Sequence, residues 1–255
     1  MALIGFLGCG KIGKALLKEI KEKQYGTVIF VQDTHADEAE IKELAPEAEV
    51  LRSSDEAWYE KADMVIECAV ASAVSENLEL ILKHCNLMMF SVTAFSDQEF
   101  ERRARRLGEE YGKNIYIPHG AVLGLDGILD GCKAWESISI ETIKNPASLG
   151  RDDKERTVIY EGTAREACHM YPRNVNVHAA VALAGLGFDK TFSKIVSDPA
   201  VSTNTHLIDV KGNGMDVQIR ISSFSEGGVT GMYTPLSACG SLKRILDCRD
   251  VIKIM

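Results

Sequence analysis

The sequence of 255 residues lacks an excess of positive charge and lacks long apolar runs. Its 29 lysines and arginines are outnumbered by 37 aspartates and glutamates, which leaves a net charge of −8. Binding a nucleic acid requires a basic face, so we expect no nucleic-acid partner. No apolar run approaches the ~20 residues that cross a bilayer, so we expect no membrane partner. The amino-terminal residues lack the basic region and cleavage site of a signal peptide, which predicts a cytoplasmic protein.

The cysteines also lack the spacing that metal sites need. The seven cysteines contain no CxxC pair, and several lie in apolar stretches. We therefore expect no bound metal and interpret the cysteines, Cys9 and Cys248 included, as reduced packing residues. Cys9 lies inside a glycine-rich turn, where it could be sensitive to oxidation, but its small size explains its presence there equally well.

The most informative feature that is present is a glycine motif near the amino terminus. An apolar strand, 2–7, runs into Gly8-x-Gly10-x-x-Gly13, and apolar residues then recur with helical spacing. A second strand, 27–32, ends at Asp33, twenty residues beyond Gly13. This pattern is typical of a dinucleotide-binding fold, in which the helix amino terminus binds the pyrophosphate and the acid binds the adenosine ribose. Because Thr34 and not an arginine follows Asp33, the sequence favours NAD over NADP.

The hydrophobic pattern predicts two domains. Residues 1–118 alternate between strand and helix, which indicates a Rossmann domain with a doubly wound parallel sheet. Residues 119–232 carry strands at 137–143, 157–160, 191–196, 203–210 and 215–222, together with a helix at 176–186. Their order favours an α+β domain built from adjacent antiparallel strands, with a hairpin turn at 212–214. The final segment, 233–255, predicts a helix whose apolar stripe returns to the Rossmann domain.

The second domain should hold the substrate and the acid–base group. His206 and Asn204 lie on the same face of a predicted strand, where an imidazole and an amide can bind a carboxylate or transfer a proton. A strand histidine is more often structural than catalytic when it is judged by spacing alone. His178 is a further candidate, and His119, at the end of the last Rossmann strand, suits either the site or a hinge. The segment 173–176 suits anion binding, although Asn174 could equally cap a helix.

Several segments of the chain match a known family. They are residues 8–13, 65–69, 93–97, 118–126, 161–167, 171–177, 182–187 and 198–206. On these segments the chain resembles the L-aspartate dehydrogenase family over nearly its whole length.

The resemblance implies an enzyme that reversibly oxidises L-aspartate to iminoaspartate with NAD, with a role in NAD biosynthesis, and that forms a homodimer. It places the catalytic histidine at His206 and cofactor contacts at Ala121 and Asn176. Asn204 and His119 are the expected substrate contacts. The full set of expected cofactor contacts is Gly8, Cys9, Gly10, Lys11, Ile12, Gly13, Asp33, Cys68, Ala69, Thr93, Ala121 and Asn176.

The chain departs from the family pattern at two positions. The family usually carries serine where this chain has His119, and many members carry arginine where this chain has Thr34. The first departure leaves open a dehydrogenase or imine reductase for another small amino acid. A protein that senses NAD without catalysis is a further alternative, which the Asn204/His206 pair opposes.

Overall fold

The computed structural model describes residues 1–224 and 231–246. The chain divides into two compact units. Unit 1 comprises Met1–Ala94, Gln98–Pro118 and the chain from Pro235 onward, and unit 2 comprises Phe95–Asp97 and His119–Thr234. Cys248 and the end of the predicted segment 233–255 lie outside the described residues. No helix in the described part of the chain is long and apolar enough to cross a membrane.

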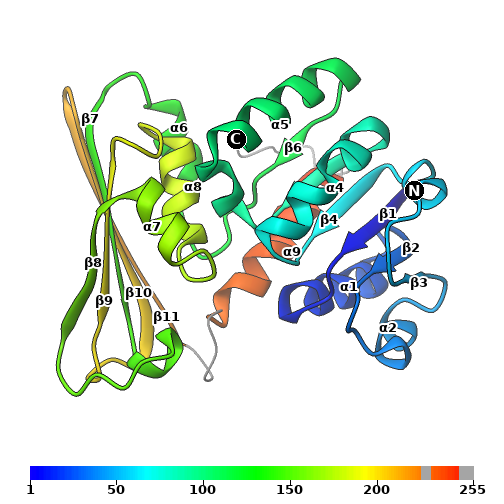
Figure 1. Cartoon of the computed structure of the whole chain (residues 1–255), viewed down its shortest axis with the longest axis horizontal. Coiled ribbons are helices and arrows are strands. Elements are labelled where there is room, and N and C mark those ends of the chain that lie inside the picture. Colours follow the sequence, from blue (N-terminus) through cyan, green and yellow to red (C-terminus); the bar gives the residue numbers. More distant parts are fainter. Residues whose placement is uncertain (225–230, 247–255) are drawn as a thin grey trace. The chain divides into compact units, whose positions relative to one another are not determined.

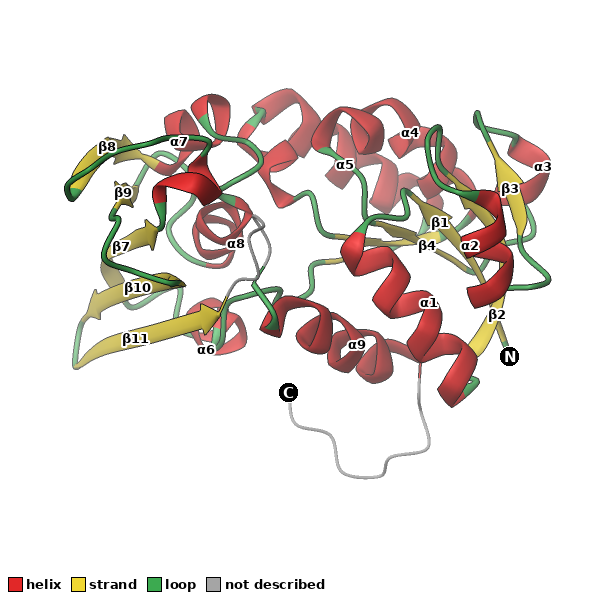
Figure 2. Cartoon of the chain, turned by 90° about the horizontal axis from the view of Figure 1, so that it is seen from below, coloured by secondary structure: helices red, strands yellow, loops and turns green. Residues whose placement is uncertain are grey.

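Unit 1 contains a six-stranded parallel sheet in the order β3-β2-β1-β4-β5-β6. Figure 2 shows helices α1 and α9 on one face of this sheet and α4 and α5 on the other. Its strands are β1 (Ala2–Leu7), β2 (Gly26–Gln32), β3 (Glu49–Leu51), β4 (Met64–Glu67), β5 (Asn86–Met89) and β6 (Ile115–Tyr116). Its helices are α1 (Lys11–Lys23), α2 (Glu38–Leu44), α3 (Glu56–Tyr59), α4 (Ala71–His84), α5 (Gln98–Tyr111) and α9 (Tyr233–Leu246), with a 3-10 helix η1 (Val92–Ser96) before α5.

Helix α9 packs into the core of unit 1. Ala238 and Leu242 are fully buried in the same apolar cluster as Leu16 and Ile20 of α1. The helix forms because its apolar residues recur on one face, and that face is stable only when it is buried. The carboxyl-terminal segment therefore contributes to the unit that carries the glycine motif.

Unit 2 contains a five-stranded sheet in the order β11-β10-β7-β9-β8. Figure 1 shows helices α6, α7 and α8 on one face of this sheet. Its strands are β7 (Trp135–Lys144), β8 (Thr157–Thr163), β9 (Thr191–Ser197), β10 (Thr203–Gly212) and β11 (Met215–Phe224). Its helices are α6 (Leu125–Asp130), α7 (Ala164–Met170) and α8 (Asn176–Ala184), with a 3-10 helix η2 (Pro146–Leu149) after β7.

The predicted fold class is confirmed, but the sheet of unit 2 is mixed where adjacent antiparallel strands were expected. Strands β7 and β9 pair in parallel, and β7 separates β9 from β10. The difference arises because β8, α7 and α8 lie between β7 and β9 in the chain, so β9 re-enters the sheet in the direction of β7. The hairpin between β10 and β11 is confirmed, with Gly214 at φ +87° in its turn.

The helix-covered face of the second sheet changes from apolar to polar along β7. Ile138 and Ile140 are buried on this face, and Thr142 and Lys144 continue the same alternation and are equally buried. Thr142 pairs directly with His206 on β10, so both side chains lie on this face. The register of β7 and β10 thus gathers polar side chains at one end of a buried surface.

Candidate functional site

The turn between β1 and α1 is shaped by a glycine that no other residue can replace without strain. Gly8 adopts φ +84°, and a Cβ there would lie 2.6 Å from the Ala69 Cβ and 2.8 Å from its backbone. The Gly8 N–H donates to the Gln32 carbonyl at 2.8 Å. The hydrogen bond joins the ends of β1 and β2, and Ala69, which follows β4, lies close to Gly8 at the carboxyl edge of the sheet, where parallel α/β folds bind their ligands.

The amino terminus of α1 is open to an anion. Its cap residue, Gly10, offers no side chain to the first N–H groups, and the first turn contains no acidic residue. A Cβ at Gly10 would meet nothing nearer than the Cys68 carbonyl oxygen at 3.9 Å. The unpaired N–H groups and the helix dipole therefore suit the pyrophosphate of a dinucleotide.

Asp33 is held in place beside this turn. Its Oδ2 accepts from the Cys9 N–H at 2.8 Å, and its Oδ1 accepts from the N–H groups of His35 and Ala36 at 2.8 and 2.9 Å. Burial raises the pKa of the Asp33 carboxyl, but these three donors outweigh it, so the pKa lies below its ordinary value. The group is an ionised acceptor, as ribose hydroxyls require.

A cation that the sequence pattern did not indicate lies next to Asp33. Arg52 follows β3, and its Nη1 donates to the Asp33 carbonyl at 2.9 Å and to the Ala36 carbonyl at 3.0 Å. The cation comes from the end of the neighbouring strand β3, so the residues adjacent to Asp33 in the sequence did not reveal it. In this arrangement the guanidinium stabilises the turn that positions the carboxylate.

The loops after β4 and β5 are joined by a buried acid that the sequence pattern also did not indicate. Glu67 is fully buried, and its Oε1 accepts from the Ala69 N–H and the Ser91 Oγ, both at 2.7 Å. Its Oε2 accepts from the Ser91 N–H at 2.9 Å. Burial raises the pKa of the carboxyl, while its hydrogen bonds lower it. The segments that follow β4 and β5, which lead to the expected cofactor contacts Ala69 and Thr93, are therefore fixed to each other.

The thiols of Cys9 and Cys68 are poor nucleophiles because both are held in the protonated form. Burial, with Asp33 nearby, raises the pKa of Cys9 to about 11, and burial raises that of Cys68 well above its ordinary value. Oxidation proceeds through the thiolate, so this environment opposes the oxidation sensitivity considered for Cys9. The remaining described cysteines form no disulfide.

In unit 2, His206 belongs to a buried chain of hydrogen bonds. Its Nδ1 lies 2.8 Å from the Thr142 Oγ1, which lies 2.6 Å from Nε2 of His178. The Nδ1 of His178 lies 2.6 Å from the Ser193 Oγ. If His206 Nδ1 donates to Thr142, each following group can donate to the next, and Nε2 of His206 is left as the acceptor. The chain can thus fix the tautomer that a base requires.

Both histidines are neutral in this environment. Burial, together with the charge of Lys144, lowers the pKa of His206 to about 3. Burial lowers the pKa of His178 as well, and the neighbouring His206 and Lys144 add to the shift. The arrangement therefore favours a neutral imidazole at His206 over an imidazolium.

Lys144 is the charged member of this buried face. It is 3% exposed, and its Nζ reaches the Asn174 Oδ1 at 3.5 Å. Burial lowers the pKa of its ammonium to about 8. Lys144 was not among the residues expected at the site. It directly follows the predicted strand 137–143 and falls on the same alternation as the buried residues of that strand, so its sequence position already indicated a buried charge.

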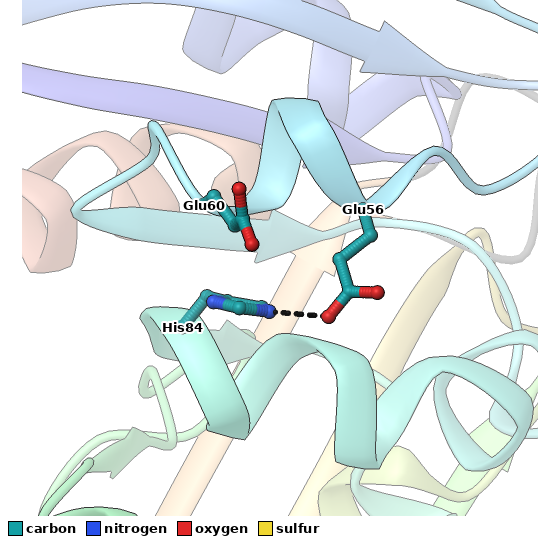
Figure 3. Close-up of side chains that lie close together, drawn as sticks. All are labelled: Glu56, Glu60 and His84. Carbon is teal, nitrogen blue, oxygen red and sulfur yellow. Dashed lines mark hydrogen bonds and ion pairs between the residues drawn. The ribbon is translucent and has the colours of Figure 1, made fainter.

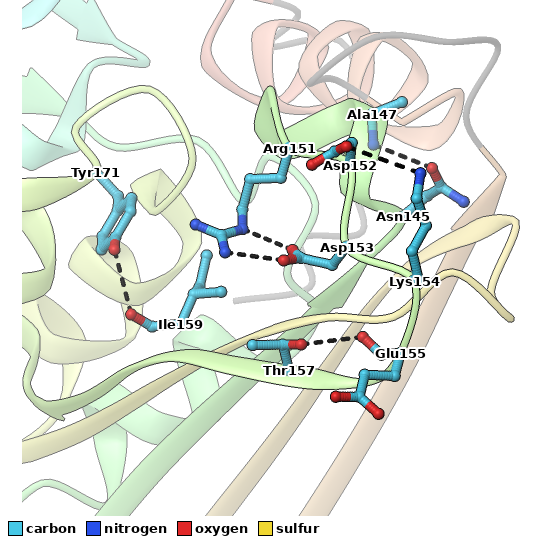
Figure 4. A network of polar contacts seen from close by, with 10 residues as sticks. All are labelled: Asn145, Ala147, Arg151, Asp152, Asp153, Lys154, Glu155, Thr157, Ile159 and Tyr171. Atoms are coloured by element: carbon cyan, nitrogen blue, oxygen red, sulfur yellow. Dashed lines mark hydrogen bonds and ion pairs between the residues drawn. The ribbon is translucent and has the colours of Figure 1, made fainter.

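The chain that follows Lys144 is fixed by polar contacts (Figure 4). Asn145 accepts from the Ala147 N–H at 3.1 Å, and its Nδ2 donates to the Val201 carbonyl at 3.1 Å. Arg151 and Asp153 form two hydrogen bonds, at 2.6 and 2.9 Å. These bonds, with Ser197 nearby, lower the pKa of Asp153 to about 2. The chain after β7 is therefore held at Asn145 by two hydrogen bonds and further along by the Arg151–Asp153 pair.

The remaining expected site residues of unit 2 lie on a strand, at the start of a helix and in a turn. Asn204 is 3% exposed on β10, two residues before His206, and Asn176 is the first residue of α8. His119 and Ala121 lie in the turn before α6, in which the Val122 N–H donates to the His119 carbonyl at 2.9 Å. Within unit 2 the register places Asn204 with His206, whereas His119 and Ala121 come from a separate loop.

One further polar cluster lies on the surface of unit 1. Glu56, Glu60 and His84 present side-chain atoms within 4.8 Å of one another (Figure 3). The Oε1 of Glu56 accepts from the Lys83 Nζ at 2.7 Å and lies 2.9 Å from the His84 Nε2. These contacts account for the cluster as exposed ion pairs, which contribute little to stability.

Comparison with known proteins covers both units. Residues 8–118 match the model of the homoserine dehydrogenase NAD-binding domain, and residues 129–245 match that of the aspartate dehydrogenase C-terminal domain. An apo scyllo-inositol dehydrogenase from Lactobacillus casei shares the fold alone, with a TM-score of 0.58 at 14% identity over 98% of this chain and 90% of that one. The fold and the glycine turn thus define a two-unit protein of the NAD-binding dehydrogenase class.

Closer relatives define the family. The L-aspartate dehydrogenase of Methanococcoides burtonii is 35% identical, covering 97% of this chain and 98% of the relative. That of Methanopyrus kandleri is 32% identical over 96% of each. The crystal structure of aspartate dehydrogenase from Thermotoga maritima matches with a TM-score of 0.80 at 28% identity over the full length of both chains. The chain belongs to the L-aspartate dehydrogenase family.

Proposed function

We propose that this protein catalyses the reversible, NAD-dependent oxidation of L-aspartate to iminoaspartate. The observation that carries the proposal is the match to L-aspartate dehydrogenases over nearly the whole chain, both units included. The product imine either enters NAD biosynthesis or hydrolyses to oxaloacetate and ammonia. As the family resemblance implies, we expect the enzyme to act as a homodimer.

The residues of unit 1 would hold the cofactor. The N–H groups at the start of α1 would bind the pyrophosphate, and Asp33 would accept hydrogen bonds from the ribose hydroxyls. Cys68 and Ala69 follow β4, and Thr93 lies in η1 after β5, at the carboxyl edge of the same sheet. When bound, the nicotinamide supplies the chemistry, because it accepts the hydride from the substrate Cα.

His206 would act as the acid–base group. The substrate ammonium must lose a proton before hydride leaves Cα, so a neutral base is required. Burial lowers the pKa of His206 and so keeps its imidazole neutral before substrate binds, and donation from Nδ1 to the Thr142 Oγ1 would leave Nε2 as the acceptor. Asn204, on the same strand face, would orient the substrate, and His119 would contribute a further contact.

The assay is reduction of NAD by the purified protein with L-aspartate, followed by absorbance of the reduced nicotinamide. A panel of small amino acids, together with their imines in the reverse direction, separates the alternatives. We expect L-aspartate to give the highest kcat/KM. A better substrate in the panel would identify a dehydrogenase for another amino acid and point to His119, whereas no turnover with measurable NAD binding would indicate a sensor.

A further inference from the structure

Lys144 places a buried positive charge on the polar face of unit 2, and the described residues of that unit offer it no paired carboxylate. Its side chain is 3% exposed, and among the described residues no carboxylate forms an ion pair with it. Its one side-chain hydrogen bond, to the Asn174 Oδ1, is long at 3.5 Å. Buried charges in proteins are normally paired, so this ammonium is an exception that requires a reason.

The position of Lys144 connects it to the proposed acid–base group. Lys144 and Thr142 are two residues apart on β7 and face the same way, and Thr142 is paired with His206 and bonded to its Nδ1. The charge on Lys144 contributes to the lowered pKa values of both His206 and His178. The cation and the base therefore belong to one cluster and not to separate sites.

We propose that Lys144 is the substrate-binding residue that pairs with a carboxylate of the amino-acid substrate. This inference rests on the proposed function and names the group that selects an acidic substrate. The ammonium supplies the missing half of an ion pair, and the carboxylate arrives with the substrate. Asn145, the next residue, is fixed by its bond to the Val201 carbonyl, so the backbone that carries the cation is positioned before binding. Because His206 is neutral, it stays available for proton transfer while Lys144 carries the charge interaction.

The test compares Lys144→Met with the wild type. Methionine keeps the length and apolar stem of lysine but removes the charge, so the fold should persist. We expect KM for L-aspartate to rise roughly 10²-fold, because an ion pair in a buried site is lost, while KM for NAD changes little. Inhibition by succinate, a dicarboxylate without an amine, should weaken by a similar factor. Lys144→Arg, which keeps the charge, should recover part of the affinity.

Lys211→Met is the matched control, because Lys211 is an exposed lysine on β10 of the same sheet. It should behave as the wild type in both assays. Unchanged KM for L-aspartate and unchanged succinate inhibition in folded Lys144→Met would overturn the role of Lys144 while leaving the proposed function intact. Absence of aspartate-dependent NAD reduction in the wild type would instead overturn the proposed function.

A pH series on the wild type tests the same role without a mutation. Succinate carboxylates are ionised throughout the range from neutral to alkaline pH, so succinate inhibition should weaken as Lys144 loses its proton above about pH 8. Among the described residues of unit 2, the charge of Lys144 lowers the pKa of His206 and of His178, and both are neutral across that range. Succinate inhibition that stays constant from pH 7 to pH 10 would contradict the inference.

Discussion

His206 is the residue whose surroundings most directly suggest a chemical role. Replacing it with alanine removes the proposed base, so kcat should fall by about 10²-fold or more while NAD binding without substrate stays nearly unchanged. His169→Ala is the control, because His169 is an exposed histidine on α7 of the same unit. Turnover near the wild-type rate in folded His206→Ala would show that the histidine is structural.

Thr142 tests whether the hydrogen-bonded chain matters to that role. Thr142→Val keeps the side-chain shape but removes the oxygen that lies between His206 and His178. We expect kcat to fall by about tenfold, because the tautomer of His206 is no longer fixed, and Thr142→Ser should retain most of the activity. Stability measured in parallel separates this effect from unfolding. Equal kcat values for the valine and serine variants would exclude a role for the hydroxyl.

Asp33 is the residue from which we expect a preference for NAD over NADP. Its carboxylate is ionised, and repulsion with a 2′-phosphate at ~4 Å costs about 1–4 kcal/mol between water-like and surface-like dielectrics. The Arg52 Nη1 donates to two carbonyls of the same turn, so it does not neutralise this carboxylate directly. We expect kcat/KM to be higher with NAD than with NADP. Equal or better efficiency with NADP would show that Arg52 or another cation binds the phosphate, and Arg52→Ala would then remove that activity.

At the level of elements, the turn between β1 and α1 depends on Gly8 for two separate reasons. Alanine there must adopt φ +84°, and its Cβ must also displace the Ala69 backbone at 2.8 Å. The left-handed conformation alone costs about 1–2 kcal/mol, and the displacement adds to that cost. We expect Gly8→Ala to lower the melting temperature and to weaken NAD binding.

Gly112→Ala separates the two effects. Gly112 has φ +62°, but a Cβ there would meet nothing within 4 Å. This variant should therefore show the conformational cost without a change in NAD affinity, measured by fluorescence titration. NAD binding by Gly8→Ala that equals that of Gly112→Ala would show that the approach of Ala69 has no bearing on the cofactor.

Elements defined by local sequence were predictable, whereas features that depend on strand pairing were not. The glycine motif, its helix and Asp33 lie within one short segment, so their spacing carries the information. Arg52 comes to the Asp33 turn from β3, and the parallel pairing of β7 with β9 depends on the path of the chain through α7 and α8. A single sequence does not specify such non-local neighbours.

The site of unit 2 was predictable in part for the same reason. Asn204 and His206 share a face through the two-residue period of one strand, which the sequence shows directly. Thr142, His178 and Ser193 join His206 from two other strands and a helix. Lys144 carried a local signal, since it continues the inward phase of β7. A charged residue at an inward position of an alternating strand therefore marks a buried charge that the sequence pattern itself contains.

At the level of the whole molecule, the buried charge of Lys144 should lower stability. Its pKa falls from 10.5 to about 8, which corresponds to roughly 3 kcal/mol at ~1.4 kcal/mol per unit. Below about pH 8 lysine is protonated in both the folded and the unfolded chain, so the full cost is present. Between about pH 8 and pH 10.5 the unfolded chain binds more protons, so the cost declines and the relative stability of the wild type rises.

Lys144→Met should therefore be more stable than the wild type at pH 7, and the difference should shrink as the pH approaches 10.5. Urea unfolding of both proteins at pH 7, 9 and 10 measures this difference, with Lys211→Met as the control for loss of an exposed charge. A variant that is less stable than the wild type at pH 7 would mean that contacts of the ammonium within the free protein outweigh its burial. Higher stability together with weaker aspartate binding would show that this charge is maintained for the substrate at the expense of the fold.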